Sequence, residues 1–221
     1  MQHILKTTED GSHTLYVPEL DEHYHSTHGA IQESLHVYLE AGLHHCDKSE
    51  INLLEIGFGT GLNAFLTLLD TEKSGKTVKY TTLERYPVSN TEAKMFNYSK
   101  LLDPSQEVKF IQLHSSPWEE WVEITPDFHL KKLQMDIKGL DKFQQGTAFD
   151  VIYYDAFAPE KQPGMWTQEI FSQLYTLSNQ GAVLTTYCAK GAVRRILQSA
   201  GYRVERLPGP PGKREILRAV K

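Results

Sequence analysis

The sequence predicts an α/β protein built on a Rossmann-like, mostly parallel twisted sheet, and three observations carry that prediction. An apolar run, Ile51–Ile56, is typical of a buried parallel strand, and glycines at alternate positions follow it at once. Strand-like and helix-like segments then alternate along much of the chain, which is the pattern of βαβ units. Two later strands end on acids, Glu84 and Asp155, and parallel strands deliver such residues to one ligand-binding edge.

Composition indicates one soluble globular domain with a small appendage. The chain has 221 residues, of which 40% are hydrophobic and 23% are charged. The net charge of −5 argues against a broadly basic surface that coats nucleic acid, but it is compatible with a local basic patch. No apolar run approaches the length that spans a bilayer, and the start, Met1–Thr7, lacks the features of a signal peptide. We therefore expect no membrane partner and a cytoplasmic location.

Cysteine and histidine usage predicts neither disulfides nor a metal site. Cys46 and Cys188 are too few and too far apart for a disulfide framework, so reduced thiols are expected. His23, His25 and His28 lie close together, but no second cluster of metal-type ligands accompanies them. No metal is therefore expected in the site.

The N-terminal segment predicts a β-hairpin followed by a helix. The dipeptide Asp10-Gly11 lies between two short strand-like runs and is a strong hairpin signal. A polar loop follows, and then apolar residues recur at helical spacing. The expected strands and helix are Ile4–Thr7, His13–Val17 and Ala30–Leu43. We expect residues 1–45 to form this appendage and residues 46–221 to form the main domain.

The glycine turn after the first core strand indicates which ligand the fold binds. The glycines let the backbone turn sharply and approach a ligand, and Ala64–Leu69 continues the chain as a helix. A dinucleotide fingerprint would need a third glycine at the position of Leu62, and that glycine is absent. Glu55, two residues before Gly57, adds a carboxylate that suits a cationic ligand. This form resembles motif I of class I S-adenosylmethionine (SAM) methyltransferases.

The second core strand is Val78–Glu84, which is rich in β-branched and aromatic residues. In Rossmann-type units an acid at this point, roughly 20 residues beyond the glycines, accepts hydrogen bonds from ribose hydroxyls. Glu84 is therefore the predicted ribose-binding residue. Pro87 is expected to open a helix that runs to about Tyr98.

Two segments compete for the third strand. Val108–Leu113 alternates in hydrophobicity, and so does Leu130–Ile137. The second is preferred because it leaves a short crossover to the next strand. Residues 99–127 then become an insertion, which we expect to be helical around Pro117–Trp121. With this assignment Asp136 is expected to lie beside an adenine.

The fourth strand, Phe149–Asp155, delivers an acid to the edge that holds the glycine turn. Methyl transfer from a sulfonium is an in-line displacement, and the enzyme must hold the nucleophile and keep an amine unprotonated. Asp155 is the best candidate to orient an amine or to take its proton. Phe157, two residues later, is a candidate to stack on a flipped-out base, with Trp166 supporting the same loop.

The C-terminal third predicts the remaining elements and a basic patch. Thr167 is expected to cap a helix, and the later elements are the strand Gly181–Tyr187, the helix Gly191–Ala200 and the antiparallel pair Tyr202–Leu207 and Glu215–Val220. Arg194 and Arg195, with Lys190, lie at one helix end, and a folded-back hairpin would add Lys213 and Arg214. Such a cluster suits phosphate groups of a nucleic acid.

Several motifs together resemble the methyltransferase domain of the MnmC-type tRNA-modifying enzymes, known as the MnmD group when that domain stands alone. The most specific is the loop D-A-F-A-P-E-K-Q-P-G-M-W-T-Q that begins at Asp155, which is similar to the family's D-G-F-A-P-x-K-N-P-x-M-W-T. The others are V-R-R at Val193, K-R-E at Lys213 and Y-H-S at Tyr24 with Glu33. Nearly the whole chain is covered, and only residues 99–127 match poorly.

The resemblance implies a class I methyltransferase with SAM as cofactor and the tRNA anticodon loop as partner. The reaction implied is methylation of the exocyclic amine of 5-aminomethyl-2-thiouridine at the wobble position. By this resemblance, SAM would contact Tyr24, Ser26, Glu33, Glu55, Gly57, Phe58, Gly59, Gly61, Asn63, Glu84, Asp136, Ile137 and Asp155. The catalytic pair would be Asp155 and Phe157, and tRNA would contact Phe157, Lys161, Trp166, Lys190, Arg194, Arg195, Lys213 and Arg214.

The chain also departs from the family pattern. Ala156 stands where the family often has glycine, which is expected to tighten the loop. Bifunctional members carry a flavin-dependent oxidase domain, and the sequence ends at Lys221 without one. We therefore expect methylation of the aminomethyl base, with a separate oxidase acting upstream. Two rivals stay open: a small-molecule N-methyltransferase or aminopropyltransferase on the same fold, and a non-catalytic SAM-binding or tRNA-binding module.

Overall fold

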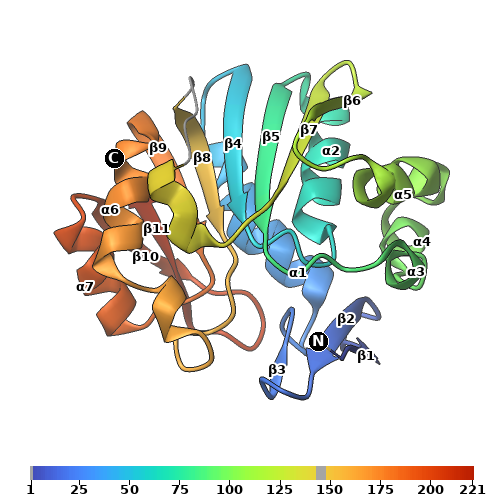
Figure 1. The fold of residues 1–221 in the computed structure, drawn as a ribbon, viewed down its shortest axis with the longest axis horizontal. Coiled ribbons are helices and arrows are strands. Elements are labelled where there is room, and N and C mark those ends of the chain that lie inside the picture. Colours follow the sequence, from blue (N-terminus) through green and yellow to red (C-terminus); the bar gives the residue numbers. More distant parts are fainter. Residues whose placement is uncertain (1, 143–147) are drawn as a thin grey trace.

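A mixed sheet organises the part of the chain that the computed structural model describes, residues 2–142 and 148–221 (Figure 1). Its eight strands in spatial order are β10 (Arg203–Pro208), β11 (Glu215–Val220), β9 (Ser178–Thr186), β8 (Phe149–Tyr154), β4 (Glu50–Ile56), β5 (Thr77–Glu84), β7 (Phe128–Gln134) and β6 (Trp121–Thr125). The central five strands, from β9 to β7, pair in parallel, whereas β10, β11 and β6 pair antiparallel. The predicted α/β class is confirmed, and so is the antiparallel C-terminal strand.

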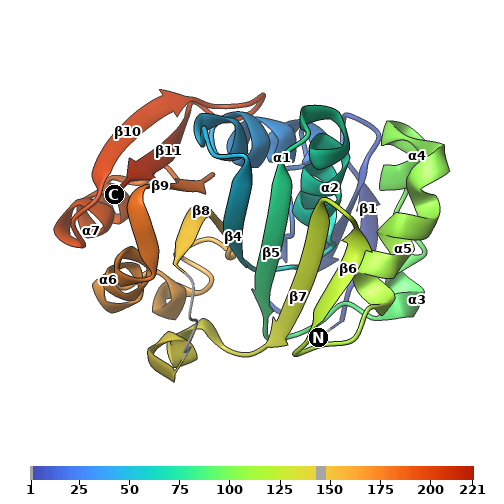
Figure 2. The same cartoon turned by 90° about the horizontal axis from the view of Figure 1, so that it is seen from above.

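Helices cover both faces of the sheet (Figure 2). One face carries α1 (Ala30–Ser34), the π-helical segment η1 (Leu35–Glu40) and α2 (Leu62–Ser74), and the other carries α6 (Gln168–Thr176) and α7 (Gly191–Ser199). Successive residues of β4 point to opposite faces, so Leu53 packs in the α2 core and Leu54 in the α6 core. The predicted cap of α6 is confirmed, because the Thr167 hydroxyl accepts a hydrogen bond from Ile170 N.

The N-terminal segment forms a small antiparallel sheet of its own. Its strands are β1 (Ile4–Thr7), β2 (His13–Val17) and β3 (Glu22–His23), so the predicted hairpin is confirmed and a short third strand is added. The predicted helix is also present, but it divides into α1 and η1 and is followed by the 3₁₀ turn η2 (Leu43–His45). The division of the chain at residue 45 stays a prediction, because Leu15 packs in the same core as Leu53.

The predicted helix from Pro87 to Tyr98 is wrong. The segment holds only the short helix α3 (Asn90–Ala93), and α4 (Tyr98–Leu102) begins where the predicted helix was expected to end. A capping box between Ser89 and Glu92 starts α3 late. Helix α3 ends at Ala93, and Asn97 is the N-cap of α4. The Asn97 side chain bonds the N-terminal hairpin, with Oδ1 accepting from His13 N and Nδ2 donating to a backbone carbonyl of that hairpin.

The preferred third strand is confirmed as β7, and its rival lies inside helix α5 (Glu107–Ser115), which follows the 3₁₀ turn η3 (Pro104–Gln106). The expected helix around Pro117–Trp121 is wrong, because Trp121 begins β6. Pro117 cannot continue α5, and the residues after it pair antiparallel with β7 instead. Since β7 ends at Gln134, Asp136 lies in the loop that leads to the 3₁₀ segment η4 (Ile137–Lys142).

Candidate active site

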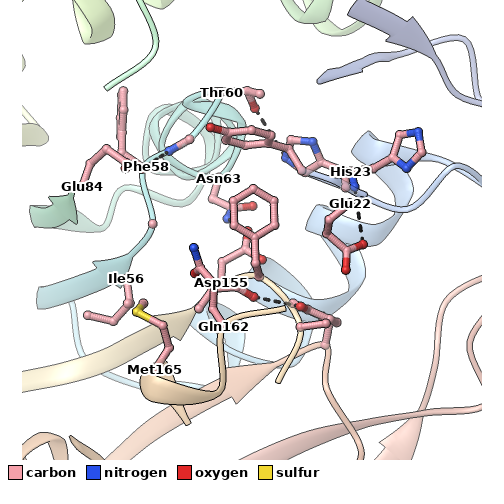
Figure 3. A pocket seen from close by; sticks show the side chains of 18 of the residues that line it. Glu22, His23, Ile56, Phe58, Thr60, Asn63, Glu84, Asp155, Gln162 and Met165 are labelled. Atoms are coloured by element: carbon pink, nitrogen blue, oxygen red, sulfur yellow. Dashed lines mark hydrogen bonds between the residues drawn. The ribbon is translucent and has the colours of Figure 1, made fainter. Parts of the chain in front are cut away.

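A cavity of about 580 Å³ opens at the carboxyl ends of β4, β5 and β8 (Figure 3). This volume is in the range of sites for small molecules and cofactors. Many of the predicted site residues line it: Tyr24, Ser26, Glu33, Gly57, Phe58, Gly59, Asn63, Glu84, Asp136, Ile137, Asp155, Phe157 and Lys213. Among residues 2–142 and 148–221, no group of three His, Cys, Asp or Glu side chains could hold a metal ion. No helix in these ranges is both long enough and apolar enough to cross a membrane.

The glycine turn brings three chain segments close together at the cavity floor. Gly57 has φ +93°, and a Cβ there would lie 2.6 Å from the carbonyl oxygen of Asp155. Gly59 has φ +49°, and a Cβ there would lie 2.9 Å from the ring of Tyr24. Glycine is therefore needed at both positions for backbone conformation and for the close approach of the turn to Asp155 and Tyr24.

Glu84 ends β5 and lies on the other side of this turn from Asp155 (Figure 3). Its Oε2 accepts a hydrogen bond from Gly59 N at 3.0 Å, and its Oε1 accepts one from Tyr86 N at 2.7 Å. Two backbone donors thus fix the carboxylate in one orientation. Asp136 lies nearby in an ion pair with Arg85, whose Nη1 is 2.6 Å from Asp136 Oδ2. This end of the cavity presents fixed acceptors, which suits hydroxyl groups such as a ribose diol.

Asp155 directly follows β8 and faces the cavity next to Asn63, which projects from α2 (Figure 3). Asn63 Nδ2 donates a hydrogen bond of 2.8 Å to Asp155 Oδ2. Burial raises the pKa of the Asp155 carboxyl to about 7, against the lowering effects of Tyr38, Asn63 and Lys213. The negative charge of Glu33 raises this pKa further. The carboxyl is therefore suited to exchange a proton near neutral pH.

An ion pair connects the N-terminal and C-terminal segments at the end of the cavity where Asp155 lies. Lys213 Nζ, from the loop between β10 and β11, lies 2.6 Å from Glu33 Oε1 of α1. Glu33 Oε2 accepts a hydrogen bond of 2.7 Å from Ser26 N, and the Lys213 ammonium lies 4.0 Å from the centre of the Tyr187 ring. A cation and an anion thus stand side by side, an arrangement that can bind the ammonium and carboxylate of an amino-acid group.

The loop after β8 contains the 3₁₀ turn η5 (Pro163–Met165), and side-chain hydrogen bonds to its backbone hold it in place. Trp166 is buried, and its Nε1 donates a hydrogen bond of 2.8 Å to Phe157 O. Tyr187 donates a hydrogen bond of 2.8 Å to Ala156 O. The Phe157 ring meets the Tyr24 ring edge to face at a centroid distance of 5.0 Å and lines the cavity. Phe157 is thus presented to a ligand, whereas Trp166 packs inside the protein and does not line the cavity.

The structure places some predicted residues away from the cavity. Glu55 is fully buried beneath it, so the expected direct contact with a cofactor is not met. Gly61 is the N-cap of α2. The predicted basic patch is spread out: Lys161 pairs with Asp21, Lys190 pairs with Glu160, Arg194 is half-buried, and Arg195 and Arg214 are exposed.

Comparison with known proteins identifies the family. A family model described as S-adenosyl-L-methionine-dependent methyltransferase matches residues 108–221, about half of the chain. The chain belongs to this family. SAM is therefore its cofactor.

Individual relatives of this methyltransferase are similar over nearly its full length. The bifunctional protein MnmC of tRNA 5-methylaminomethyl-2-thiouridine biosynthesis from Magnetococcus marinus is 32% identical over 94% of this chain. The chain spans about a third of the length of that relative. The crystal structure of MNMC2 from Aquifex aeolicus superposes with a TM-score of 0.80 at 25% identity, covering 99% of this chain and 70% of that one. Spermidine synthase from Thermotoga maritima, with a TM-score of 0.54 and 15% identity over 100% of this chain and 72% of that one, shares the fold alone.

Three site residues of this methyltransferase lay outside the sequence prediction. Arg85 pairs with Asp136, and its position directly after Glu84 in the sequence is a signal that it lies at the site. Tyr187 lines the cavity and ends the predicted strand Gly181–Tyr187. Tyr38 lies within the predicted helix Ala30–Leu43, and helical spacing alone does not show that its hydroxyl faces Asp155. Its position depends on the π-helical turn η1, which the pattern does not reveal.

Proposed function

We propose that this methyltransferase methylates the exocyclic amine of 5-aminomethyl-2-thiouridine at the tRNA wobble position, giving 5-methylaminomethyl-2-thiouridine. The observation that carries the proposal is the Asp155 carboxyl, which faces the cavity between the glycine turn and Phe157. Asp155 and Phe157 lie at the start of the loop that resembles the most specific motif of the MnmC-type enzymes. The similarity to MnmC over most of the chain supports the same substrate.

The cavity residues fit SAM by charge and shape. Glu84, held by two backbone donors, would bind the ribose hydroxyls, and Asp136 with Ile137 would lie beside the adenine. Glu33 and Lys213 would bind the ammonium and the carboxylate of the amino-acid group. Glycine at positions 57 and 59 lets the turn pack directly against Asp155 and Tyr24, where a Cβ would clash. When bound, SAM supplies an electrophilic methyl group on a cationic sulfonium.

The protein's own residues prepare the acceptor amine. An alkylammonium has no free lone pair and cannot attack, so one proton must leave the nitrogen before the methyl group is transferred. The Asp155 carboxylate accepts that proton or a hydrogen bond from the amine, and its pKa of about 7 suits this exchange. Phe157 offers an aromatic face on which the uracil ring can stack. Beyond this proton transfer, catalysis would depend on positioning the amine against the methyl group and on exclusion of water.

The substrate would also contact the surface around the cavity. Exposed cations on α7 and on the β10–β11 loop, Arg195 and Arg214, are candidates for anticodon-loop phosphates, together with Lys161, Lys190 and Arg194. A tRNA substrate implies a cytoplasmic location. It also implies an upstream reaction that supplies the primary amine, such as a flavin-dependent oxidase acting on the carboxymethylaminomethyl base.

Transfer of radiolabel from methyl-labelled SAM separates this proposal from its rivals. The protein is incubated with bulk tRNA from cells that lack the wobble methyltransferase, and in parallel with a mixture of polyamines and small amines. We expect label in tRNA, a strong loss of label with Asp155→Asn, and no loss with Glu120→Gln, which changes an exposed carboxylate far along the chain from the loop. Label only in the small amines would favour the small-molecule enzyme. Tight SAM binding without any transfer would favour a binding module.

A further inference from the structure

A second carboxyl group, Glu55, lies buried beneath Asp155. It belongs to the central strand β4, is 0% exposed, and accepts a hydrogen bond of 2.8 Å from Thr82 Oγ1 of β5. No lysine, arginine or histidine among the side chains described, those of residues 2–140 and 148–221, pairs with it. An ionised carboxylate without a cationic partner is very costly at such a site, so the neutral acid is favoured. Burial accordingly raises the pKa of Glu55 to about 8.

The Asn63 amide stands between the two carboxyl groups. Its Nδ2 donates to Asp155 Oδ2 at 2.8 Å, and the same amide also faces Glu55. Glu55 Oε1 and Asn63 Oδ1 are both buried and have no hydrogen-bond partner in the structure. The buried Tyr80 hydroxyl also faces Glu55 and has no other hydrogen-bond partner among the described residues, but its one proton can satisfy only one of the two acceptors. A proton on Glu55 supplies the second donor.

The single negative charge of this cluster belongs on Asp155. Two carboxyl groups that face one amide repel each other when both are ionised, so one of them keeps its proton. Asp155 opens into the cavity near the Lys213 ammonium, whereas Glu55 has only uncharged neighbours apart from Asp155. The groups that face Glu55 are Asn63, Tyr80, Thr82, Tyr153 and Asp155, and those that face Asp155 are Glu33, Tyr38, Asn63, Tyr187 and Lys213.

We propose that Glu55 is a positioning residue that stays protonated during turnover, so that the Asn63 amide donates to Asp155 alone. An ionised Glu55 would compete for the same amide hydrogens and would oppose the charge on Asp155. Its role is therefore to keep the reactive carboxylate ionised and oriented, without contact with cofactor or substrate. This inference rests on the proposed role of Asp155 in the transfer.

The test compares Glu55→Gln, which is neutral and nearly isosteric, with Glu55→Leu, which removes the polar group. For Glu55→Gln we expect SAM affinity and kcat within about threefold of the unmodified protein, because the neutral side chain makes equivalent hydrogen bonds. The acid limb of the pH–rate profile should stay in place. For Asn63→Leu, kcat should fall, and the acid limb should move to higher pH because the Asp155 carboxylate loses its amide donor. Glu55→Leu keeps that donor but removes the polar group that orients the amide, so it should move the limb in the same direction by a smaller amount.

Other outcomes would overturn the proposal. If Glu55→Gln moves the acid limb to lower pH, Glu55 is ionised in the working enzyme and its charge was raising the pKa of Asp155. If Glu55→Gln weakens SAM binding by about tenfold or more, the Glu55 charge serves the cofactor directly. Thermal unfolding and circular dichroism of each variant identify simple loss of fold.

An infrared difference measurement keeps this test separate from the proposed function. At neutral pH the difference spectrum between the unmodified protein and Glu55→Gln should contain the carbonyl stretch of one protonated carboxylic acid, because Glu55→Gln removes that acid and leaves the Asp155 charge in place. This readout needs no tRNA, so inactivity on tRNA would defeat the proposed function alone. Absence of that band from the difference spectrum would defeat the inference about Glu55, whatever the substrate.

Discussion

Glu84 ends β5 and Asp155 directly follows β8, two parallel strands on either side of β4. Both acids lie at the carboxyl edge of the sheet, yet the protein gives them different environments. Glu84 accepts two backbone hydrogen bonds, from Gly59 N and Tyr86 N, which hold a fixed acceptor. Asp155 accepts from the Asn63 side chain, and burial raises its pKa to about 7. Backbone donors stabilise a carboxylate that only binds, whereas burial and a single amide leave a carboxyl that can exchange a proton.

The largest expected effect tests the reactive end of this comparison. In Asp155→Asn the side chain keeps its shape but can neither accept a proton nor carry charge. We expect single-turnover methyl transfer to fall by about 10²–10⁴-fold, the usual contribution of a general base, with SAM affinity nearly unchanged. Quench-flow with labelled SAM and calorimetric SAM binding measure the two quantities. A loss of less than about fivefold at neutral pH would remove Asp155 from the chemistry.

The next effect tests the binding end. Glu84→Gln keeps the side-chain length but replaces a charged acceptor, and hydrogen bonds to charged groups are worth about 1.5–3 kcal/mol. We expect SAM affinity to weaken by about 10–100-fold, with the transfer rate at saturating SAM largely retained. The matched control is Glu120→Gln, which should change neither value. If Glu84→Gln reduced SAM affinity and the transfer rate by equal factors, Glu84 would act in the reaction as well as in binding, and it would not differ from Asp155 in role.

A pH profile sharpens the comparison further. Asp155 acts in its deprotonated form, so the rate at saturating SAM should rise with pH through about 7 and be lost below it. The Lys213 charge lowers the pKa of Asp155, so Lys213→Met should move this limb to higher pH and reduce the rate at neutral pH by about threefold. Lys213→Arg keeps the charge and should leave the limb in place. A limb that moves to lower pH in Lys213→Met would contradict the assigned environment.

The contrast between the two acids also shows what the sequence can predict. Glu84 and Asp155 were identifiable because each ends an apolar strand, and parallel strands share one carboxyl edge. Glu55 was expected in the site because it precedes Gly57, but α2 and β5 seal its side chain from the cavity. Which side chains seal it depends on how helix and sheet pack, and local pattern does not contain that information.

Long-range pairing explains the other gaps in the prediction. The Glu33–Lys213 pair joins residues from opposite ends of the chain, so neither neighbourhood reveals it. The strand β6 was missed because Trp121–Thr125 is short and gains its hydrogen bonds only from β7. The separate start of α4 also involves a distant contact, because its N-cap Asn97 bonds the N-terminal hairpin.

The smallest expected effect concerns the support of Phe157. Trp166→Phe keeps an aromatic ring in the core but removes the donor to Phe157 O, a hydrogen bond worth about 1 kcal/mol. We expect Tm to fall by about 2–4 °C, with SAM affinity unchanged and only a modest rise in KM for tRNA. Differential scanning calorimetry measures the first quantity. A loss of turnover comparable with that of Asp155→Asn would show that Trp166 acts in the reaction itself.

The central claim is that the amine presented to Asp155 is the aminomethyl group of the wobble base. Nucleoside mass spectrometry of tRNA from cells that lack the wobble methyltransferase, treated with this protein and SAM, tests it most directly. The account predicts that 5-aminomethyl-2-thiouridine gains one methyl group and that no other nucleoside changes. A methyl group on a different nucleoside, or no change while SAM still binds, would contradict the claim and assign the site to another acceptor.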